Sequence, residues 1–600
     1  MSMSKIIPFV NRRIEVVDGE SIEGTYFFLA CSNGAEIENE KGLSSKECFE
    51  FLSSCEEKGK NILTIFGINY DVQNWLVSFP RLHLESFYNS TGFKPVKMRA
   101  EDETYFLSYL KGKKFSCKKK LGKSFTVWET FTFFQESFVK VLEKNLPSAK
   151  KYLEEIRKMK EKRSQFSWSE KELIKKYCRK EVLLHREVME SFFEKLRNLE
   201  VELKNLFSPA SIAKHYFVKH DVKRGLEERN FQELNNSYYG GRFELIRFGK
   251  SENKIYEYDI NSAYPFAMTS LLSAKGEWRK EKRIKDEFSL IELTWRFPKE
   301  LPFFPFPFRT NGTIIFPSIG RSFIRGVEYF SGKRFRDKFG GKIKINNIWN
   351  FYPRENRKIF HYINYLYDER KEYKRQGDGA EKILKLVINS SYGATAQLHP
   401  AKGKWFQMEW ASWITAKTRS MVLEAALLAP ESIISFATDS VLSTRKLPLP
   451  ISEKLGGWSE EVYEGIIIVQ SGLYFMKKEN EWKIRTRGFS SREISKEIIE
   501  EAWKNKERKI KIKCVRFASL SKGVIEGKWN EWRKWITIEK EIDVLGNSEK
   551  RINIARQFPK KSLIFLHPVS NFESEYQIFQ ENERNDESQV EIEELDGVLL

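Results

Sequence analysis

The pattern of apolar and polar positions predicts alternating strands and helices in the N-terminal part of the chain. Short apolar runs at 14–17, 25–31 and 61–66 are typical of strands, and residues 45–55 carry apolar positions at helical spacing. A longer helical pattern covers 169–196. Strands that alternate with helices in this way predict an α/β domain.

In the middle third, two apolar strands each lead to an aspartate. The run 256–259 ends at Asp259 and is followed by a turn toward Pro265. The run 433–438 leads to Asp439, and apolar residues resume directly after it, which predicts a hairpin with Asp439 at its tip.

Two helices are predicted between these strands. The first covers 355–376 and ends at the Gly-Asp-Gly turn 377–379, a turn that suits antiparallel helices. In the second helix Lys385, Asn389 and Tyr392 are spaced i, i+4 and i+7, so they share one face.

These residue types suit nucleotidyl transfer. Divalent cations such as Mg²⁺ prefer oxygen ligands, so carboxylates from separate strands must converge, and Asp259 and Asp439 are the candidates. A bound triphosphate needs cations directed at it. Arg370 and Lys374 near the helical turn, together with Lys385, are candidates for that task.

Four segments, in this order, resemble the motifs of B-family DNA polymerases, and in particular the small viral and mobile-element members that are protein-primed-like. The resemblance covers about 10–500 of the chain. The four segments are Tyr238-Tyr-Gly-Gly241, Asp259-Ile-Asn-Ser-Ala-Tyr264-Pro265, Lys385-Leu-Val-Ile-Asn389-Ser-Ser-Tyr392-Gly393 and Ser435-Phe-Ala437-Thr438-Asp439-Ser440.

The resemblance implies a role for each matching residue. Asp259 and Asp439 would hold two Mg²⁺ or Mn²⁺ ions with the carbonyl of Ile260, and Tyr264 would exclude a ribose 2′-hydroxyl by steric clash. The implied substrate-binding residues are Tyr264, Arg370, Lys374, Lys385, Asn389, Tyr392 and Thr438. The implied DNA-binding residues are Tyr239, Gly240, Gly241, Tyr474, Arg485 and Arg487.

The chain departs from the family pattern at two places. Ala437 stands where the third motif has its first aspartate, the less essential carboxylate of the usual metal scheme, so retained activity is expected. Before the thumb, Gly472-Leu-Tyr474 replaces the family's Lys-x-Tyr, and Arg485 or Arg487 is expected to supply the missing charge.

The N-terminal part resembles an RNase-H-like 3′→5′ exonuclease with two metals of its own. Asp18-Gly-Glu20 corresponds to the first nuclease motif, and Asp71 ends the second. Tyr177 and Glu181 lie one helical turn apart and correspond to the third, in which the family has an aspartate instead of Glu181. By the resemblance, all five are catalytic residues, and Asp18, Glu20 and Asp71 bind metal.

The expected fold is therefore multidomain, α/β followed by α+β, with an exonuclease domain and then the palm, fingers and thumb of a right-hand polymerase. The expected boundaries are 1–234 for the N-terminal and exonuclease-like domain, 235–353 and 395–488 for the palm, 354–394 for the fingers, 489–572 for the thumb and 573–600 for an acidic disordered tail.

Composition agrees with this interpretation. The formal charge of +20 favours a polyanionic partner, and the expected partners are primer-template DNA, dNTPs and a terminal protein or other replication factor. Sparse cysteines and the lack of a long apolar run predict an intracellular protein without a membrane partner, in the host cytoplasm if it is viral. Two alternatives remain open, a nuclease with a degenerate polymerase half and a non-catalytic nucleic-acid-binding scaffold.

Overall fold

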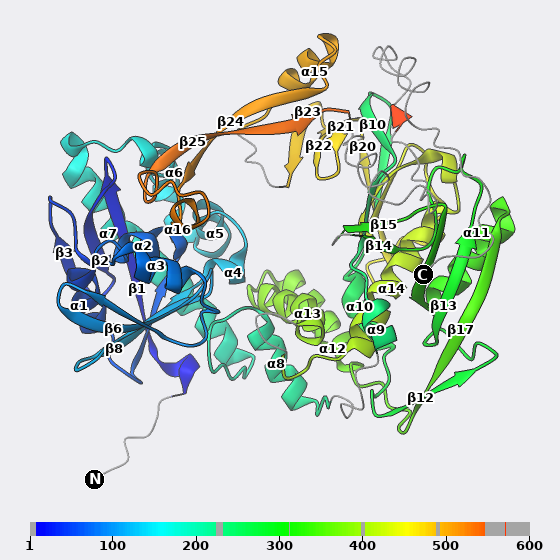
Figure 1. Ribbon diagram of the computed structural model, residues 1–600, viewed down its shortest axis with the longest axis horizontal. Coiled ribbons are helices and arrows are strands. Elements are labelled where there is room, and N and C mark those ends of the chain that lie inside the picture. Colours follow the sequence, from blue (N-terminus) through cyan, green and yellow to red (C-terminus); the bar gives the residue numbers. More distant parts are fainter. Residues whose placement is uncertain are drawn as a thin grey trace. The chain divides into compact units, whose positions relative to one another are not determined.

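The computed structural model describes residues 8–223, 232–310, 313–397, 403–487, 493–545 and 570–571 (Figure 1). The chain forms two compact units. The first comprises Met1–Lys219, Leu366–Ser391 and Val515–Ile538, and the second comprises His220–Tyr365, Tyr392–Cys514 and Glu539–Leu600. The predicted tail at 573–600 lies outside the described residues. Among the helices that are described, none is both long and apolar enough to cross a membrane.

The first unit is built on an eight-stranded mixed sheet in the order β3-β2-β1-β4-β8-β7-β6-β5. The three strands β3, β2 and β1 are antiparallel, whereas β4 runs parallel to β1 and β8 runs parallel to β4. The strands are β1 (Arg13–Ile22), β2 (Thr25–Cys31), β3 (Glu36–Glu38), β4 (Asn61–Ile65), β5 (Val96–Ala100), β6 (Glu103–Leu110), β7 (Lys114–Lys119) and β8 (Ser124–Glu129).

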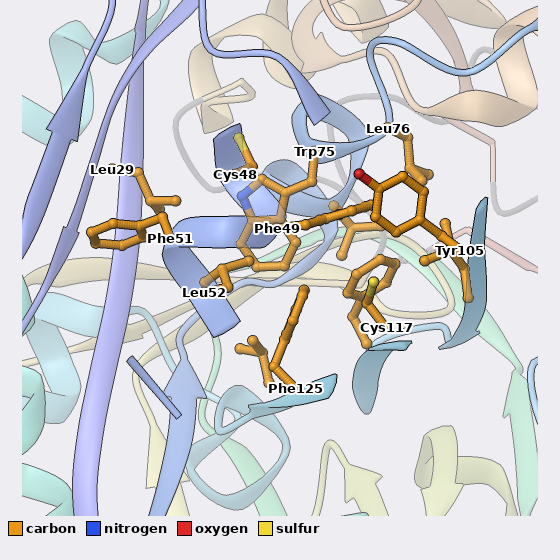
Figure 2. Close-up of a cluster of buried hydrophobic side chains, with 14 of the residues drawn as sticks. Leu29, Cys48, Phe49, Phe51, Leu52, Trp75, Leu76, Tyr105, Cys117 and Phe125 are labelled. Carbon is orange, nitrogen blue, oxygen red and sulfur yellow. The ribbon is translucent and has the colours of Figure 1, made fainter. Parts of the chain in front are cut away.

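An aromatic core and three short helices stabilise this sheet. Helix α1 (Ser45–Cys55) begins with a capping box, in which the Ser44 hydroxyl accepts from the Glu47 amide at 3.2 Å and the Glu47 carboxylate accepts from the Ser44 amide at 2.8 Å. Phe49 of this helix lies in the centre of the buried cluster in Figure 2, with its ring 5.1 Å from that of Tyr105. Helices α2 (Asn69–Trp75) and α3 (Arg81–Tyr88) contribute to the same cluster.

The long helix α7 (Lys171–Asn198) packs against β1 and β2 through a second apolar cluster. Ile174, Tyr177 and Cys178 lie in that cluster, which shows why the helical pattern at 169–196 has an apolar face. Because β1 is buried along nearly its whole length, the polar residues that it carries are buried too. The nuclease candidates of β1 and α7 are therefore placed in the interior of the unit.

The two helices predicted between the motif strands are α12 (Tyr362–Gln376) and α13 (Ala380–Ala396), and Gly377 between them has a φ of +72°. The first helix begins seven residues later than the predicted 355. The cause is a tertiary contact, because Lys358 pairs with Leu272 in an isolated β-bridge that holds the segment before the helix in a non-helical conformation.

Among its described residues, the second unit contains three sheets of four or five strands and a two-stranded sheet of β14 (Phe308–Thr310) and β15 (Thr313–Ile315). The sheet that carries the motif strands has the order β20-β11-β19-β18-β9, with β9 (Arg242–Leu245), β11 (Ile255–Ile260), β18 (Ile433–Thr438), β19 (Ser440–Ser443) and β20 (Trp458–Tyr463). Helix α14 (Met408–Ala426) contacts β18 and β19 and also packs on α10 (Ala263–Thr269) and α11 (Gly326–Phe339).

The other two large sheets use strands that alternate with those of the motif sheet along the chain. One has the order β12-β17-β13-β16, with β12 (Gly276–Glu281), β17 (Lys342–Pro353), β13 (Leu290–Arg296) and β16 (Ile319–Arg325). The other has the order β23-β22-β21-β10-β26, with β23 (Glu481–Thr486), β22 (Leu473–Lys478), β21 (Gly465–Gln470), β10 (Arg247–Ser251) and β26 (Ser570–Asn571).

The region expected as a thumb starts with helix α15 (Lys496–Lys504), whose buried residues include Ile499 and Ala502. It continues as a two-stranded sheet of β24 (Lys509–Phe517) and β25 (Trp535–Asp543), with α16 (Leu520–Val524) in the connection between them. Residues 515–538 belong to the first compact unit.

Candidate active sites

The structure places Asp259 and Asp439 on neighbouring strands. Strands β11 and β19 are antiparallel and pair Asp259 with Ser440, the residue that follows Asp439. The amide of Ile260 donates to the carbonyl of Asp439 at 3.0 Å. Asp439 lies at the tip of the β18–β19 hairpin, where Thr438 takes a φ of +64°. The two aspartates are thus brought together by the backbone ladder of the sheet.

The electrostatics of this pair suit a cation. Desolvation raises the pKa of Asp259 to about 7, and the negative charges of Asp439 and Glu257 add to the shift. Burial also raises the pKa of Asp439. A carboxylate whose ionisation is disfavoured by burial and by a neighbouring carboxylate gains from a divalent cation, which both carboxylates could coordinate. Ala437 pairs with Phe243 and Ser440 in the same sheet and adds no oxygen ligand.

Three tyrosines form a cluster beside these aspartates. The hydroxyl groups of Tyr238 and Tyr392 are 2.7 Å apart, and the ring centroids of Tyr264 and Tyr392 are 4.5 Å apart. Gly241 lies so close to this cluster that a Cβ atom would be 2.6 Å from Thr438 Cγ2 and 3.0 Å from the Tyr264 hydroxyl. All four sequence motifs therefore contribute to one site.

The side chain of Tyr239, for which the resemblance implied contact with DNA, is buried. It is 4% exposed, and its hydroxyl is hydrogen-bonded to that of Ser322. A buried ring is unsuited to a direct DNA contact, so the expectation for the Tyr239 side chain is corrected. Gly240 and Gly241 of the same segment remain DNA-contact candidates.

The candidates on the helical pair lie at its surface. Lys385 and Asn389 are both exposed on α13, on the face that also carries Tyr392. Lys374 of α12 is exposed as well. Arg370 is half-buried, and its Nε lies 3.3 Å from Glu381, so an intramolecular carboxylate already neutralises it.

Tyr474, Arg485 and Arg487 come together on β22 and at the end of β23. Tyr474 pairs directly with Arg485 across the two strands. The Arg487 amide donates to the carbonyl of Gly472 at 2.7 Å, and the Arg487 guanidinium lies 4.5 Å from the Phe243 ring centroid. Arg485 therefore stands across from Tyr474, and Arg487 lies against the turn that precedes it.

The nuclease candidates form a second, more buried site in the first unit. Asp18 and Glu20 lie on β1 and Glu181 lies on α7, and one carboxylate oxygen from each falls within 4.8 Å of the others. Asp71 lies on α2, where its Oδ1 accepts a hydrogen bond from the Tyr26 hydroxyl at 2.8 Å. Among the described residues, Asp18, Glu20 and Glu181 are the acidic side chains whose oxygens lie close enough together to hold a metal ion.

Burial controls the protonation of this site. Desolvation raises the pKa of Glu20 and that of Asp71 to about 7, and it raises the pKa of Asp18 well above its ordinary value. Two oxygens, Glu20 Oε1 and Glu181 Oε2, are buried with no hydrogen-bond donor among the described residues. Orphaned carboxylate oxygens in a carboxylate cluster fit a divalent cation.

Two basic residues of this site were not singled out from the sequence. Lys160 Nζ donates to Glu181 Oε1 at 2.5 Å, and Arg163 Nε donates to Glu20 Oε2 at 3.1 Å. Burial alone would raise the pKa of Glu181, but the charges of Lys160 and Arg163 outweigh that effect and lower it. Both bases precede α7 in the chain, and no spacing rule connects them to acids 21 and 143 residues away.

Tyr177 lies one turn before Glu181 on α7. Its side chain is 1% exposed, and its hydroxyl has no hydrogen-bond partner among the described residues. The side chains of Tyr177 and Glu181 thus share the buried face of the helix, as the i, i+4 spacing predicts.

The comparisons with known proteins agree with this geometry. The model of a protein family described as DNA polymerase type B, organellar and viral, matches residues 109–412, just over half of the 600 residues. The chain belongs to this family of type B DNA polymerases. The resemblance that its motifs indicated is thereby confirmed.

Two curated relatives are viral. The DNA polymerase of Acidianus bottle-shaped virus (isolate Italy/Pozzuoli) is 27% identical over 284 residues, which cover 44% of this chain and 42% of that protein. The DNA-directed DNA polymerase of Enterobacteria phage PRD1 is 26% identical over 315 residues, which cover 45% of this chain and 54% of that protein. The chain thus spans about half the length of the curated relatives that it matches.

Among solved structures, Phi29 DNA polymerase complexed with primer-template DNA and incoming nucleotide substrates superposes with a TM-score of 0.58 and 12% identity. The likeness covers 89% of this chain and 99% of that chain. The structure of the same polymerase complexed with single-stranded DNA gives a TM-score of 0.57. The expected fold class, an exonuclease domain followed by a right-hand polymerase, is confirmed.

Proposed function

We propose that this protein is a template-directed DNA polymerase that adds dNTPs to a primer 3′ end. The observation that carries the proposal is that Asp259 and Asp439 lie on, and at the end of, paired strands beside the tyrosine cluster. The acidic pair is suited to hold the metal ions of nucleotidyl transfer, and the cluster is suited to hold a nucleoside. Both aspartates, Tyr238 and Tyr264 lie in the region expected as palm, 235–353 and 395–488, whereas Tyr392 comes from the region expected as fingers, 354–394.

Asp259 and Asp439, with the Ile260 carbonyl, are the proposed ligands of two Mg²⁺ or Mn²⁺ ions. Such ions, when bound, would lower the barrier to attack by the primer hydroxyl and stabilise the departing pyrophosphate. The chain itself supplies the rest. Exposed Lys385 and Lys374 offer charge to phosphates, and Asn389 and Thr438 complete the proposed substrate-binding set.

Arg370 joins that set only if it exchanges Glu381 for phosphate oxygens, because its guanidinium is paired with that carboxylate. Tyr264 is the proposed sugar selector and Tyr392 supports the base pair. Gly240, Gly241, Tyr474, Arg485 and Arg487 are the proposed contacts to the DNA backbone, which positions a duplex without reading its sequence.

The first unit is proposed to remove nucleotides from a primer 3′ end. Its support is the acidic group Asp18, Glu20 and Glu181 with two orphaned oxygens. Asp71 and Tyr177 complete the proposed catalytic set. Glu181 takes the place of the family's aspartate, and it reaches the other two carboxylates despite its extra methylene.

Primer-template DNA and dNTPs are the proposed partners in the replication of a viral or mobile-element genome, with a terminal protein or other replication factor as a further one; whether synthesis starts on a protein, on a nucleic acid or without a primer stays open. The test is extension of a labelled primer on a defined template with Mg²⁺, one dNTP at a time, resolved on a gel. Addition of only the complementary nucleotide supports the polymerase. A reaction without dNTPs shortens the primer if the nuclease is active, and Asp18→Ala abolishes that shortening.

The two alternatives give other patterns in the same assay. Shortening without any extension would identify a nuclease with a degenerate polymerase half, for which Ala437 is the motivating residue. Binding of primer-template DNA with neither extension nor shortening would identify a scaffold.

A further inference from the structure

Arg419 is a buried arginine that belongs to none of the sequence motifs. It lies on α14, and its side chain is 3% exposed. Its Nε donates to Glu328 Oε1 on α11 at 2.9 Å, and Glu328 is equally buried. An ion pair so deep in a protein is costly to desolvate, and removal of either partner leaves the other charge buried without compensation.

The other contacts of Arg419 lead to the active site. Its NH1 group donates to the carbonyl of Tyr239 at 2.8 Å and to that of Gly240 at 2.6 Å. The guanidinium also lies 5.6 Å from the Tyr239 ring centroid. One side chain therefore holds two consecutive peptide groups of the 238–241 segment. A guanidinium is suited to this task because its donors form a rigid fork, whereas an ammonium group is a single point charge.

The 238–241 segment is in turn packed against residues of the nucleotide pocket. At one end, the Tyr238 hydroxyl is bonded to that of Tyr392. At the other end, Gly241 has no room for a Cβ atom because Thr438 and Tyr264 lie against it. A shift of the segment toward Tyr264 and Thr438 would therefore press on these residues, and Thr438 directly precedes Asp439.

The charge of Arg419 also acts on the pocket. Burial raises the pKa of Tyr264 to about 12, and the positive charge of Arg419 opposes this shift. The NH2 group of Arg419 is buried and has no hydrogen-bond acceptor among the described residues. The contacts of Nε and NH1, rather than a complete set of hydrogen bonds, thus fix the side chain.

We infer that Arg419 is a positioning residue for nucleotide selection, which acts through the carbonyls of Tyr239 and Gly240 on Tyr264. The inference rests on the proposed polymerase function. Removal of Arg419 frees the buried carbonyl of Tyr239 and the partly buried carbonyl of Gly240, which must move or find water. Tyr264 then loses its fixed position, and a steric barrier against a 2′-hydroxyl depends on that position being fixed.

The experiment compares wild type, Arg419→Lys and Arg419→Met in steady-state single-nucleotide incorporation with a dNTP and with the matching rNTP. Arg334→Met is the matched control. Arg334 also joins α11 to α14, because its Nε donates to Glu424 at 2.8 Å, but this pair is on the surface. Active-site titration corrects each rate for the fraction of folded enzyme, and thermal melting reports stability separately.

We expect Arg419→Met to raise the KM for the dNTP about tenfold, the usual effect of losing hydrogen bonds from a charged donor, with a smaller change in kcat. Its preference for dNTP over rNTP in kcat/KM falls by a similar factor. Arg419→Lys gives intermediate values because it keeps the charge but not the fork, and Arg334→Met matches wild type.

A purely structural role for Arg419 would lower the melting temperature of Arg419→Met and leave its KM and sugar preference per active molecule unchanged, and that result overturns the inference. If Arg419→Met does not fold, wild-type KM and sugar preference in Arg419→Lys overturn it in the same way. Absence of extension by wild type removes the polymerase function and this inference with it, whereas extension by wild type with unchanged variants removes the inference alone.

Discussion

The amide of Ile260 donates a hydrogen bond of 3.0 Å to the carbonyl of Asp439. This bond belongs to the backbone, so it survives any substitution of the carboxylates that flank it. The separation of Asp259 and Asp439 is therefore set by the register of β11 and β19, in which Asp259 faces Ser440. Substitutions at either aspartate test its chemistry without dismantling the sheet.

The first prediction concerns pH. Desolvation and then the charge of Asp439 raise the pKa of Asp259 to about 7, so its metal-binding, ionised form becomes more populated as pH rises. At subsaturating Mg²⁺, single-turnover incorporation should become faster between about pH 6 and about pH 8. Saturating Mg²⁺ should move the midpoint to lower pH, because the ion favours the ionised carboxylate. If the midpoint of the pH dependence stays the same at every Mg²⁺ concentration, the ionisation of Asp259 is not linked to metal binding.

The second prediction concerns stability near Asp71. Burial raises its pKa to about 7 in the folded state, above the ordinary value of the unfolded chain. The folded state then holds a proton that the unfolded state has released, so this contribution to stability is lost as pH rises from about 4 to about 7. Asp71→Asn cannot ionise and keeps an oxygen for the Tyr26 hydroxyl.

In EDTA, the free energy of unfolding of Asp71→Asn minus that of wild type should therefore increase from about pH 5 to about pH 8. Urea unfolding at each pH measures it, and Asp102→Asn at an exposed turn is the control. A difference that stays constant or decreases with pH would show that Asp71 is not destabilised by burial.

The third prediction concerns the length of Glu181. Glu181 reaches Asp18 and Glu20 with one methylene more than the family's aspartate, and α7 fixes its backbone. Glu181→Asp should withdraw the carboxylate and slow primer shortening about ten- to a hundredfold, the usual effect of disturbing a metal site, and Glu181→Gln should slow it at least as much. Primer extension in the same preparations is the internal control. Shortening by Glu181→Asp at or above the wild-type rate would show that the site does not require the extra methylene of Glu181.

The fourth prediction concerns the 515–538 segment. Gln73 Oε1 accepts from the Leu520 amide at 2.7 Å and from Trp532 Nε1 at 3.0 Å, both of which lie within the first compact unit. Gln73→Leu leaves two donors without their acceptor, which should weaken the docking of this segment by about 1–3 kcal/mol. We expect faster hydrogen exchange of the 515–538 backbone amides in Gln73→Leu and unchanged exchange in β1. Unchanged exchange in both regions would contradict the role given to Gln73.

Sequence patterns located the residues whose positions follow from local structure. Asp259 and Asp439 come at the ends of apolar strands, and Lys385, Asn389 and Tyr392 follow helical spacing, so periodicity and motif order were sufficient to group them. The start of α12 was predicted too early, because a bridge between Leu272 and Lys358 is a tertiary contact that no local pattern contains.

Residues that act through distant partners could not be found in this way. Arg419 donates a hydrogen bond to Tyr239, which is 180 positions away in the sequence, and Arg163 donates one to Glu20, which is 143 positions away. In the sequence both are ordinary arginines of helical segments, where a charged residue usually faces solvent. Their bonds to buried groups make them important, and those bonds depend on how α14 and the segment after α6 (Leu153–Lys162) pack.

The most direct test of the account is primer extension by Asp259→Asn and Asp439→Asn, with Asp337→Asn as a control that makes the same change on the exposed surface of α11. Hydrogen-exchange protection of β11 and β19 verifies that the ladder is intact in each variant. The account predicts extension by wild type and by Asp337→Asn, and a loss of at least about a hundredfold in both active-site variants, the scale on which electrostatic stabilisation contributes to catalysis. Extension by either variant at a rate near that of wild type would contradict it.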